Sequence, residues 1–67
     1  MALNLREDWA MLRGAEVEVR LGKAVVRSGF VDDVMPDSSA IWLAYDGVQP
    51  RAIYDAGSGY EVWAANS

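Results

Sequence analysis

The sequence predicts a mainly β fold, a small antiparallel barrel of five strands with one short α-helix before it. Three observations support this fold class. Short β-rich runs fill residues 28–63, turn-forming clusters separate these runs at close intervals, and an amphipathic segment precedes them. At 67 residues the chain has room for a single domain, 1–67, with the helix at 4–13 and the barrel at 15–64.

The helix is predicted from the spacing of apolar residues. Leu5, Trp9 and Leu12 recur at intervals of four and three residues, so a helix places them on one side. Asn4 is positioned to cap the first turn, and Gly14 to end the helix in a left-handed conformation. A helix this short does not persist alone, so Trp9 and its neighbours are expected to dock on the barrel.

Alternation of apolar and polar residues predicts the strands. Residues 15–21 alternate strictly, as a half-buried strand does, and a long strand follows at 24–35. Gly29 inside this second strand predicts a bend and a change of phase. Val26 is then expected to face inward before the glycine, and Val31 after it. Further strands are expected at 40–45, 51–55 and 60–64, with a hairpin signal at Asp46-Gly47 and a single 3₁₀ turn before the last strand.

Composition limits both the core and the chemistry. Apolar residues make up 52% of the chain, which predicts a packed core. The chain has no cysteine and no histidine, so disulfides, thiolate chemistry, zinc fingers and histidine bases are excluded. A domain of this size buries only about 60% of the surface that its unfolded chain exposes, so self-association is an expected source of stability.

The order of these elements carries a resemblance. A long strand bent in SGFVDDV, an AIWL strand after a turn, a hairpin and a one-turn connection into a last short strand resemble the SH3-like and Sm-like small barrels. For an Sm-like protein the resemblance implies RNA binding in the pore of a ring whose subunits pair edge to edge. The positions that carry RNA contacts in that family are occupied here by Met35 and Ser39, and Asp55 stands where a cation would be. These departures favour the fold over the RNA function.

The aromatic residues supply the candidate interaction surface. Trp42 and Trp63 fall opposite the inward residues of their strands, so both are expected to project outward. With Tyr54 and Arg51 they offer large rigid side chains and a charge to a partner protein or to a second copy. The alternative is that Trp9 packs over one of the two outward tryptophans and closes a second small core.

Two narrower roles are also open for these residues. Arg51 shares a side with Ile53 in strand phase, which places it at a barrel edge near Asp33 or Asp55 as ion-pair partners. An aromatic cage for a cation, as in the Tudor members of the SH3-like group, needs rings and a carboxylate to converge on one point. The residues that would form such a cage are Trp42, Tyr45, Tyr54 and Asp46.

No catalytic, cofactor-binding or metal-binding motif is present in the sequence. Turn formation explains the aspartates, and the serines have no histidine or lysine partner in a recognisable arrangement. The net charge of −4 removes the overall phosphate attraction of a nucleic-acid-binding domain and leaves only a local basic patch as an alternative. That patch would consist of Arg13, Arg20, Lys23, Arg27 and Arg51.

The sequence therefore predicts a non-enzymatic module for protein interaction or self-association, acting through outward aromatic residues or a free strand edge. A homo-oligomer is expected, without cofactors. The alternative is an Sm-like module that binds RNA. No stretch approaches the roughly 20 apolar residues of a membrane span, so no membrane partner and a cytoplasmic location are expected.

Overall fold

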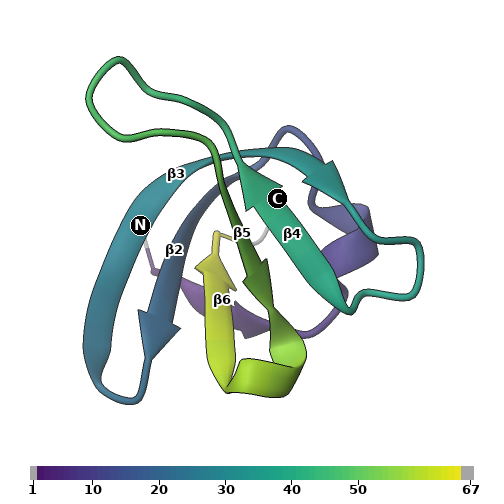
Figure 1. Cartoon of the computed structure of the whole chain (residues 1–67). Helices are drawn as coiled ribbons and strands as arrows, with labels where there is room; N and C mark the ends of the chain where they lie inside the picture. The colour runs from purple at the N-terminus through teal and green to yellow at the C-terminus, as the bar shows by residue number, and fades with distance from the viewer. Residues whose placement is uncertain (1, 66–67) are drawn as a thin grey trace.

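The computed structural model describes residues 2–65, which form a six-stranded antiparallel sheet and two single-turn 3₁₀ helices (Figure 1). The order of strands across the sheet is β1-β6-β2-β3-β4-β5. The mainly β prediction is confirmed, whereas the α-helix and the count of five strands are wrong. In chain order the elements are β1 (Asn4–Arg6), η1 (Trp9–Met11), β2 (Glu16–Leu21), β3 (Ala24–Val34), β4 (Ala40–Leu43), β5 (Ala52–Asp55), η2 (Ala56–Ser58) and β6 (Tyr60–Ala64).

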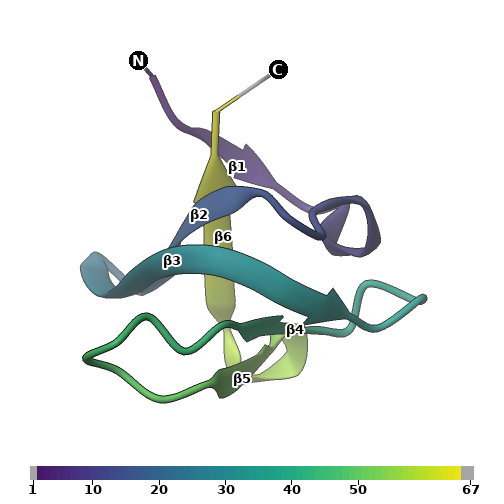
Figure 2. The same ribbon diagram turned by 90° about the horizontal axis from the view of Figure 1, so that it is seen from above.

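The sheet curls without closing into a barrel. Within the described part of the chain, β1 pairs only with β6 and β5 only with β4, so these two strands are its edges. Seen from above, β1 and the β4–β5 pair lie on opposite sides, and β3 runs between them (Figure 2). β3 joins the two halves because its first part pairs with β2 and its second part with β4. The predicted long strand shared by both halves is confirmed, and the closed barrel is not formed.

The N-terminal segment is a strand and a turn instead of the predicted helix. β1 pairs with β6, and η1 is a single 3₁₀ turn that buries Trp9, with Leu12 buried just after it. Leu5 lies on the exposed outer face, and Asn4, inside a strand, caps nothing. Gly14 has the expected left-handed φ of 82°, although no helix precedes it. A short helix gains little by itself, whereas β1 gives β6 the main-chain partners that a free edge lacks.

Two β-bulges in β3 change which residues face the core. The first leaves Val26 as an extra residue opposite β2, and the second leaves Asp32 as an extra residue opposite β4. Val26 is therefore on the surface, 41% exposed, and Arg27 is turned inward, only 5% exposed. Val31 is buried as predicted, whereas Gly29 lies at neither bulge. The strand changes phase at its two bulges, so the predicted change of phase at Gly29 and the inward Val26 were wrong.

The core lies between the two halves of the curled sheet. Its most deeply buried side chains come from three strands and are Val19, Ile41, Leu43 and Val62. Trp9 and Leu12 complete this cluster from the N-terminal turn, and Tyr54 and Tyr60 pack against it. β2 and β6 thus show the predicted alternation. In β2 the apolar residues face inward and the charged residues outward, and in β6 Val62 and Ala64 face inward while Glu61 and Trp63 lie on the other face.

Aspartates form the turns as the sequence predicted. Asp37 accepts a hydrogen bond on Oδ1 from the N–H of Ser39 at 3.0 Å. Asp46 accepts on Oδ1 from the N–H of Val48 at 2.9 Å and of Gln49 at 2.6 Å. These side chains satisfy backbone donors that a loop would otherwise leave to water. The loop that Asp46 organises, residues 44–51, projects beyond the sheet in both views (Figures 1 and 2).

Candidate interaction surface

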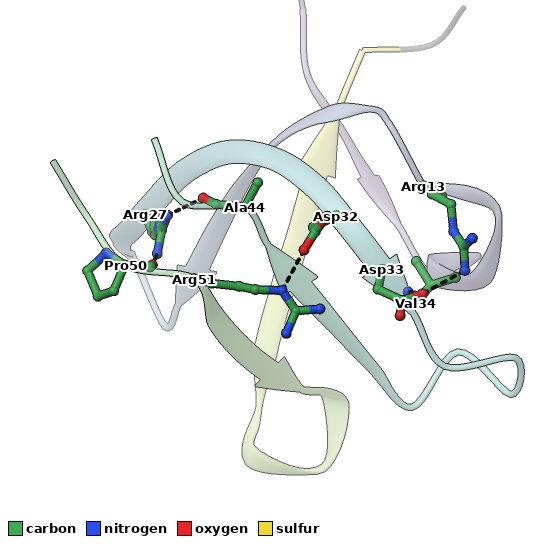
Figure 3. A network of polar contacts seen from close by, with 8 residues as sticks. All are labelled: Arg13, Arg27, Asp32, Asp33, Val34, Ala44, Pro50 and Arg51. Carbon is green, nitrogen blue, oxygen red and sulfur yellow. Dashed lines mark hydrogen bonds and ion pairs between the residues drawn. The ribbon is translucent and has the colours of Figure 1, made fainter. Parts of the chain in front are cut away.

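The outer face of β4 and β5 brings together two of the four predicted interaction residues. Trp42 is half-buried there, and the Arg51 guanidinium lies 5.7 Å from the centre of its ring. Arg51 Nε donates to Asp32 Oδ2 at 2.5 Å (Figure 3), and not to either aspartate that the sequence suggested. Ile53 lies opposite Trp42 in the strand register and is 54% exposed. We call Trp42, Arg51 and Ile53 the β5-edge face.

Trp63 lies on the outer face of the other half of the sheet. Arg20 Cζ is 4.3 Å from the centre of the Trp63 ring, and Arg20 Nε donates to Glu18 Oε1 at 2.6 Å. The indole N–H of Trp63 donates to Glu61 Oε1 at 3.3 Å. This stack lies on β6 and β2, and β3 separates it from the β5-edge face. Trp9 belongs to the core cluster and neither outer tryptophan does, so the alternative of a second small core over them is not observed.

Tyr54 points to the opposite side of its strand from the predicted surface. It packs against the core, and its ring lies 5.1 Å from that of Tyr60 in an edge-to-face arrangement at 76°. The reason is the register, because Tyr54 pairs with the buried Ile41 and not with the half-exposed Trp42. The cage predicted from two tyrosines, Trp42 and Asp46 is therefore not assembled.

Arg27 holds the loop between β4 and β5 from beneath. Its guanidinium donates to the main-chain oxygens of Pro50 and Ala44, the latter at 2.7 Å (Figure 3). A longer contact of 3.5 Å reaches Gln49 O. Arg27 Nε has no hydrogen-bond partner among the described residues. The sequence suggested Arg27 for a basic patch and did not indicate that it holds this loop, because only the bulge at Val26 turns the side chain inward.

The cations do not form a basic patch. Four arginines are each paired with a carboxylate, one is buried, and Lys23 is the sixth cation of the chain. The predicted nucleic-acid alternative depends on a cluster of free cations, which this arrangement does not supply. The ion pairs are Arg6–Asp8, Arg13–Asp33, Arg20–Glu18 and Arg51–Asp32.

Among the hollows on the surface of the described residues, two bear on function. The larger, about 570 Å³, is a mainly apolar groove between β1, η1 and the start of β2, with Leu3, Met11 and Leu12 in its wall. The smaller, about 400 Å³, is lined by two aromatic and two acidic side chains among others. We call it the aromatic–acidic hollow, and these four residues are Glu16, Phe30, Tyr45 and Asp46.

Three aspartates have lowered pKa values, each because its charged form accepts hydrogen bonds. The Arg6 guanidinium lowers the pKa of Asp8, and hydrogen bonds from Ser39 lower that of Asp37. The backbone N–H groups of Gln49 and Val48, and the positive charge of Arg27 behind them, lower the pKa of Asp46. All three groups stay ionised at neutral pH, and none of them has the raised pKa of a general acid. Asp37 and Asp46 accept turn hydrogen bonds, whereas Asp8 is in an ion pair with Arg6.

No protein-family model, curated protein or solved structure matches the chain. Within residues 2–65, neither 3₁₀ turn has the length and apolar character that crossing a membrane requires. In the same range, no three Asp or Glu side chains come together as a metal-binding group would. Functional inference therefore depends on the surfaces described above.

Proposed function

We propose that this chain is a non-enzymatic protein-interaction module that associates through the β5-edge face. The observation that carries the proposal is the position of Ile53. It is an exposed aliphatic residue beside Trp42, on a strand whose second side has no partner strand within the described residues. A free edge offers backbone N–H and C=O groups to another strand, and the outward Trp42 and Ile53 add apolar contact area.

Self-association is the form of interaction that this face favours. Two copies of β5 can pair antiparallel about a two-fold axis, which places the Trp42–Ile53 pairs of the two copies on one face of a continuous sheet. Such a dimer would also add buried apolar area to a chain of 67 residues, which has little to spare.

The finer fold assignment is part of the same proposal. We propose that β2 to β6, as part of an open curled sheet, have the strand arrangement of the SH3-like group, with β1 as an added edge strand. The support is the strand order β6-β2-β3-β4-β5 together with the single 3₁₀ turn between the last two strands. RNA binding of the Sm-like type is the weaker alternative, because ion pairing and burial occupy five of the six cations.

Light scattering across protein concentration tests the proposal, with Ile53→Glu as the disrupting variant. The matched control is Val25→Glu, since Val25 on β3 is 55% exposed and Ile53 is 54% exposed. We expect a wild-type mass above that of the 7.3 kDa chain, a return to 7.3 kDa for Ile53→Glu, and no change for Val25→Glu. A wild-type mass of 7.3 kDa at every concentration would refute self-association through this face.

A further inference from the structure

The aromatic–acidic hollow pairs each acidic residue with an aromatic one. Glu16 on β2 lies directly opposite Phe30 on β3 in the strand register, and Tyr45 and Asp46 are consecutive in the loop after β4. The loop is tied to the strand because the N–H of Ala44 donates to Phe30 O at 2.9 Å. Both rings are open to solvent, with Phe30 58% and Tyr45 67% exposed. Two segments distant in sequence therefore build one small site.

The surrounding contacts hold this site in shape before any ligand arrives. Arg27 fixes Ala44 O and Pro50 O, which bracket the loop that carries Tyr45 and Asp46 (Figure 3). In the described structure the hydrogen bonds that Asp46 accepts end on Oδ1, which leaves Oδ2 for a ligand. A site fixed in this way loses little conformational freedom on binding.

The other two outer aromatic positions show what chemistry fits here. The Arg20 guanidinium lies over the Trp63 ring and is hydrogen-bonded to Glu18. The Arg51 guanidinium lies over the Trp42 ring and is hydrogen-bonded to Asp32. Each is a ring, a guanidinium and a carboxylate in contact. The hollow has the rings and the carboxylates, but no lysine or arginine is among the described residues that line it. Arg27 lies behind the loop and is directed at main-chain oxygens, so it does not fill this position.

We propose that the aromatic–acidic hollow binds an arginine side chain of a partner protein. The guanidinium would lie against Phe30 and Tyr45 and receive charge pairing from Glu16 and Asp46. Arginine fits better than lysine because its planar group stacks on rings and bonds carboxylates in a fork. The proposal rests on the chain being an interaction module, but it uses a surface apart from the β5-edge face. It predicts a partner with a basic segment, which also suits a chain of net charge −4.

The test is a titration of the ¹⁵N-labelled full chain, followed by two-dimensional NMR, with a blocked Gly-Arg-Gly tripeptide. The matched probe replaces arginine by citrulline, which has nearly the same shape and no charge. We expect the arginine peptide to shift the amide signals of Phe30, Tyr45 and Asp46, and to bind roughly three- to tenfold more tightly than the citrulline peptide. Raising the salt concentration should reduce this difference.

Variants assign the binding to the hollow. Glu16→Gln removes one charge with little change of shape, and Tyr45→Ala removes an exposed ring, so each is expected to weaken arginine binding at least about threefold. The control is Val48→Ala, because Val48 is 89% exposed in the same loop and does not line the hollow. If Tyr45→Ala alters the fold, Glu16→Gln decides the test.

Three outcomes would overturn the proposal. They are equal binding of the arginine and citrulline peptides, unchanged binding by both hollow variants, and shifts confined to the β1–η1 groove or to the β5-edge face. The Ile53→Glu mass measurement is independent of this titration. A monomeric wild type that still binds arginine in the hollow would refute self-association alone. An oligomeric wild type that does not bind arginine would refute the hollow's proposed ligand alone.

Discussion

Arg27→Met removes the hydrogen bonds that hold the loop between β4 and β5, which we call the clamp. Its cost in unfolding free energy can be worked out from these contacts. Hydrogen bonds to a charged group contribute roughly 1.5–3 kcal/mol each, so the bonds to Pro50 O and Ala44 O have a gross value of about 3–6 kcal/mol. Two effects offset part of this value. The exposed loop lets the freed oxygens bond water, and methionine removes a buried guanidinium whose Nε has no partner in the described residues.

The expected net loss is about 2 kcal/mol of unfolding free energy. For a domain of this size that corresponds to a fall in Tm of roughly 8–16 °C. Urea unfolding followed by tryptophan fluorescence measures it, because Trp9 is buried in the core. The midpoint should fall with an unchanged m-value, which would show lost stability without a change in the surface exposed on unfolding.

Arg20→Met is the matched control for Arg27→Met. Arg20 is partly exposed and its ion pair with Glu18 is of the surface type, so the expected loss is only about 0–1 kcal/mol. Hydrogen exchange adds a local readout, since loosening the loop should speed exchange at the Val48 and Gln49 amides before it affects β2. Equal midpoints for the two variants, or a loop whose exchange is unchanged in Arg27→Met, would refute the clamp.

Three further predictions concern the core, the turns and the acid range. Trp9→Ala should lower the unfolding free energy by about 3–5 kcal/mol, and circular dichroism should show that much of the chain is unfolded. Met11→Ala, at a 77% exposed position, should have an unfolding free energy within about 0.5 kcal/mol of the wild-type value. Gly59→Ala should lower the unfolding free energy by about 1–2 kcal/mol, because the φ of Gly59 is +90°. Gly29→Ala should be tolerated, since the added Cβ would make only an ordinary contact at 3.8 Å. A lower urea midpoint for Gly29→Ala than for Gly59→Ala would contradict this prediction. The backbone hydrogen bonds from Gln49 and Val48 hold the folded-state pKa of Asp46 below its ordinary value, so its stabilisation is present above the ordinary pKa and is lost as pH falls through the folded pKa. Asp46→Asn, which keeps the turn acceptor, should flatten the fall of Tm below about pH 4, and an identical acid profile would exclude the contribution.

The sheet was predictable where one strand carries its own pattern. β2 alternates apolar and charged residues, β6 alternates buried and partly exposed ones, and the aspartate turns need only local hydrogen bonds, so neighbours in sequence were enough to place them. The predicted helix was wrong because a partner distant in sequence decides the structure of that segment. The spacing of Leu5 and Trp9 fits a helix, but the segment found better main-chain partners on β6, which lies at the far end of the chain.

Part of the candidate site was likewise predictable from the sequence, and part depended on the register between strands. Trp42 and Arg51 were predicted for one outer surface, because Trp42 lies in a short strand with a clear phase and Arg51 comes directly before the next strand. It assigned Tyr54 to the same surface, although the register with Ile41 turns that ring toward the core. The aromatic–acidic hollow had no linear signal, because Glu16 and Asp46 are 30 positions apart and line one hollow only through the pairing of β2 with β3 and the hydrogen bond of Ala44 to Phe30.

By itself, the sequence determined the fold class, the turns, the acidic charge and the absence of cysteine and histidine chemistry, because these depend on composition and on residues close together in the chain. The tertiary structure decided where the bulges fall, that Arg27 points inward, which cations are paired, and that the sheet formed by residues 2–65 ends at β1 and β5. Each of these depends on the register between distant strands. A shift of one residue exchanges the two faces of a strand, and local pattern does not determine that shift where a bulge interrupts it.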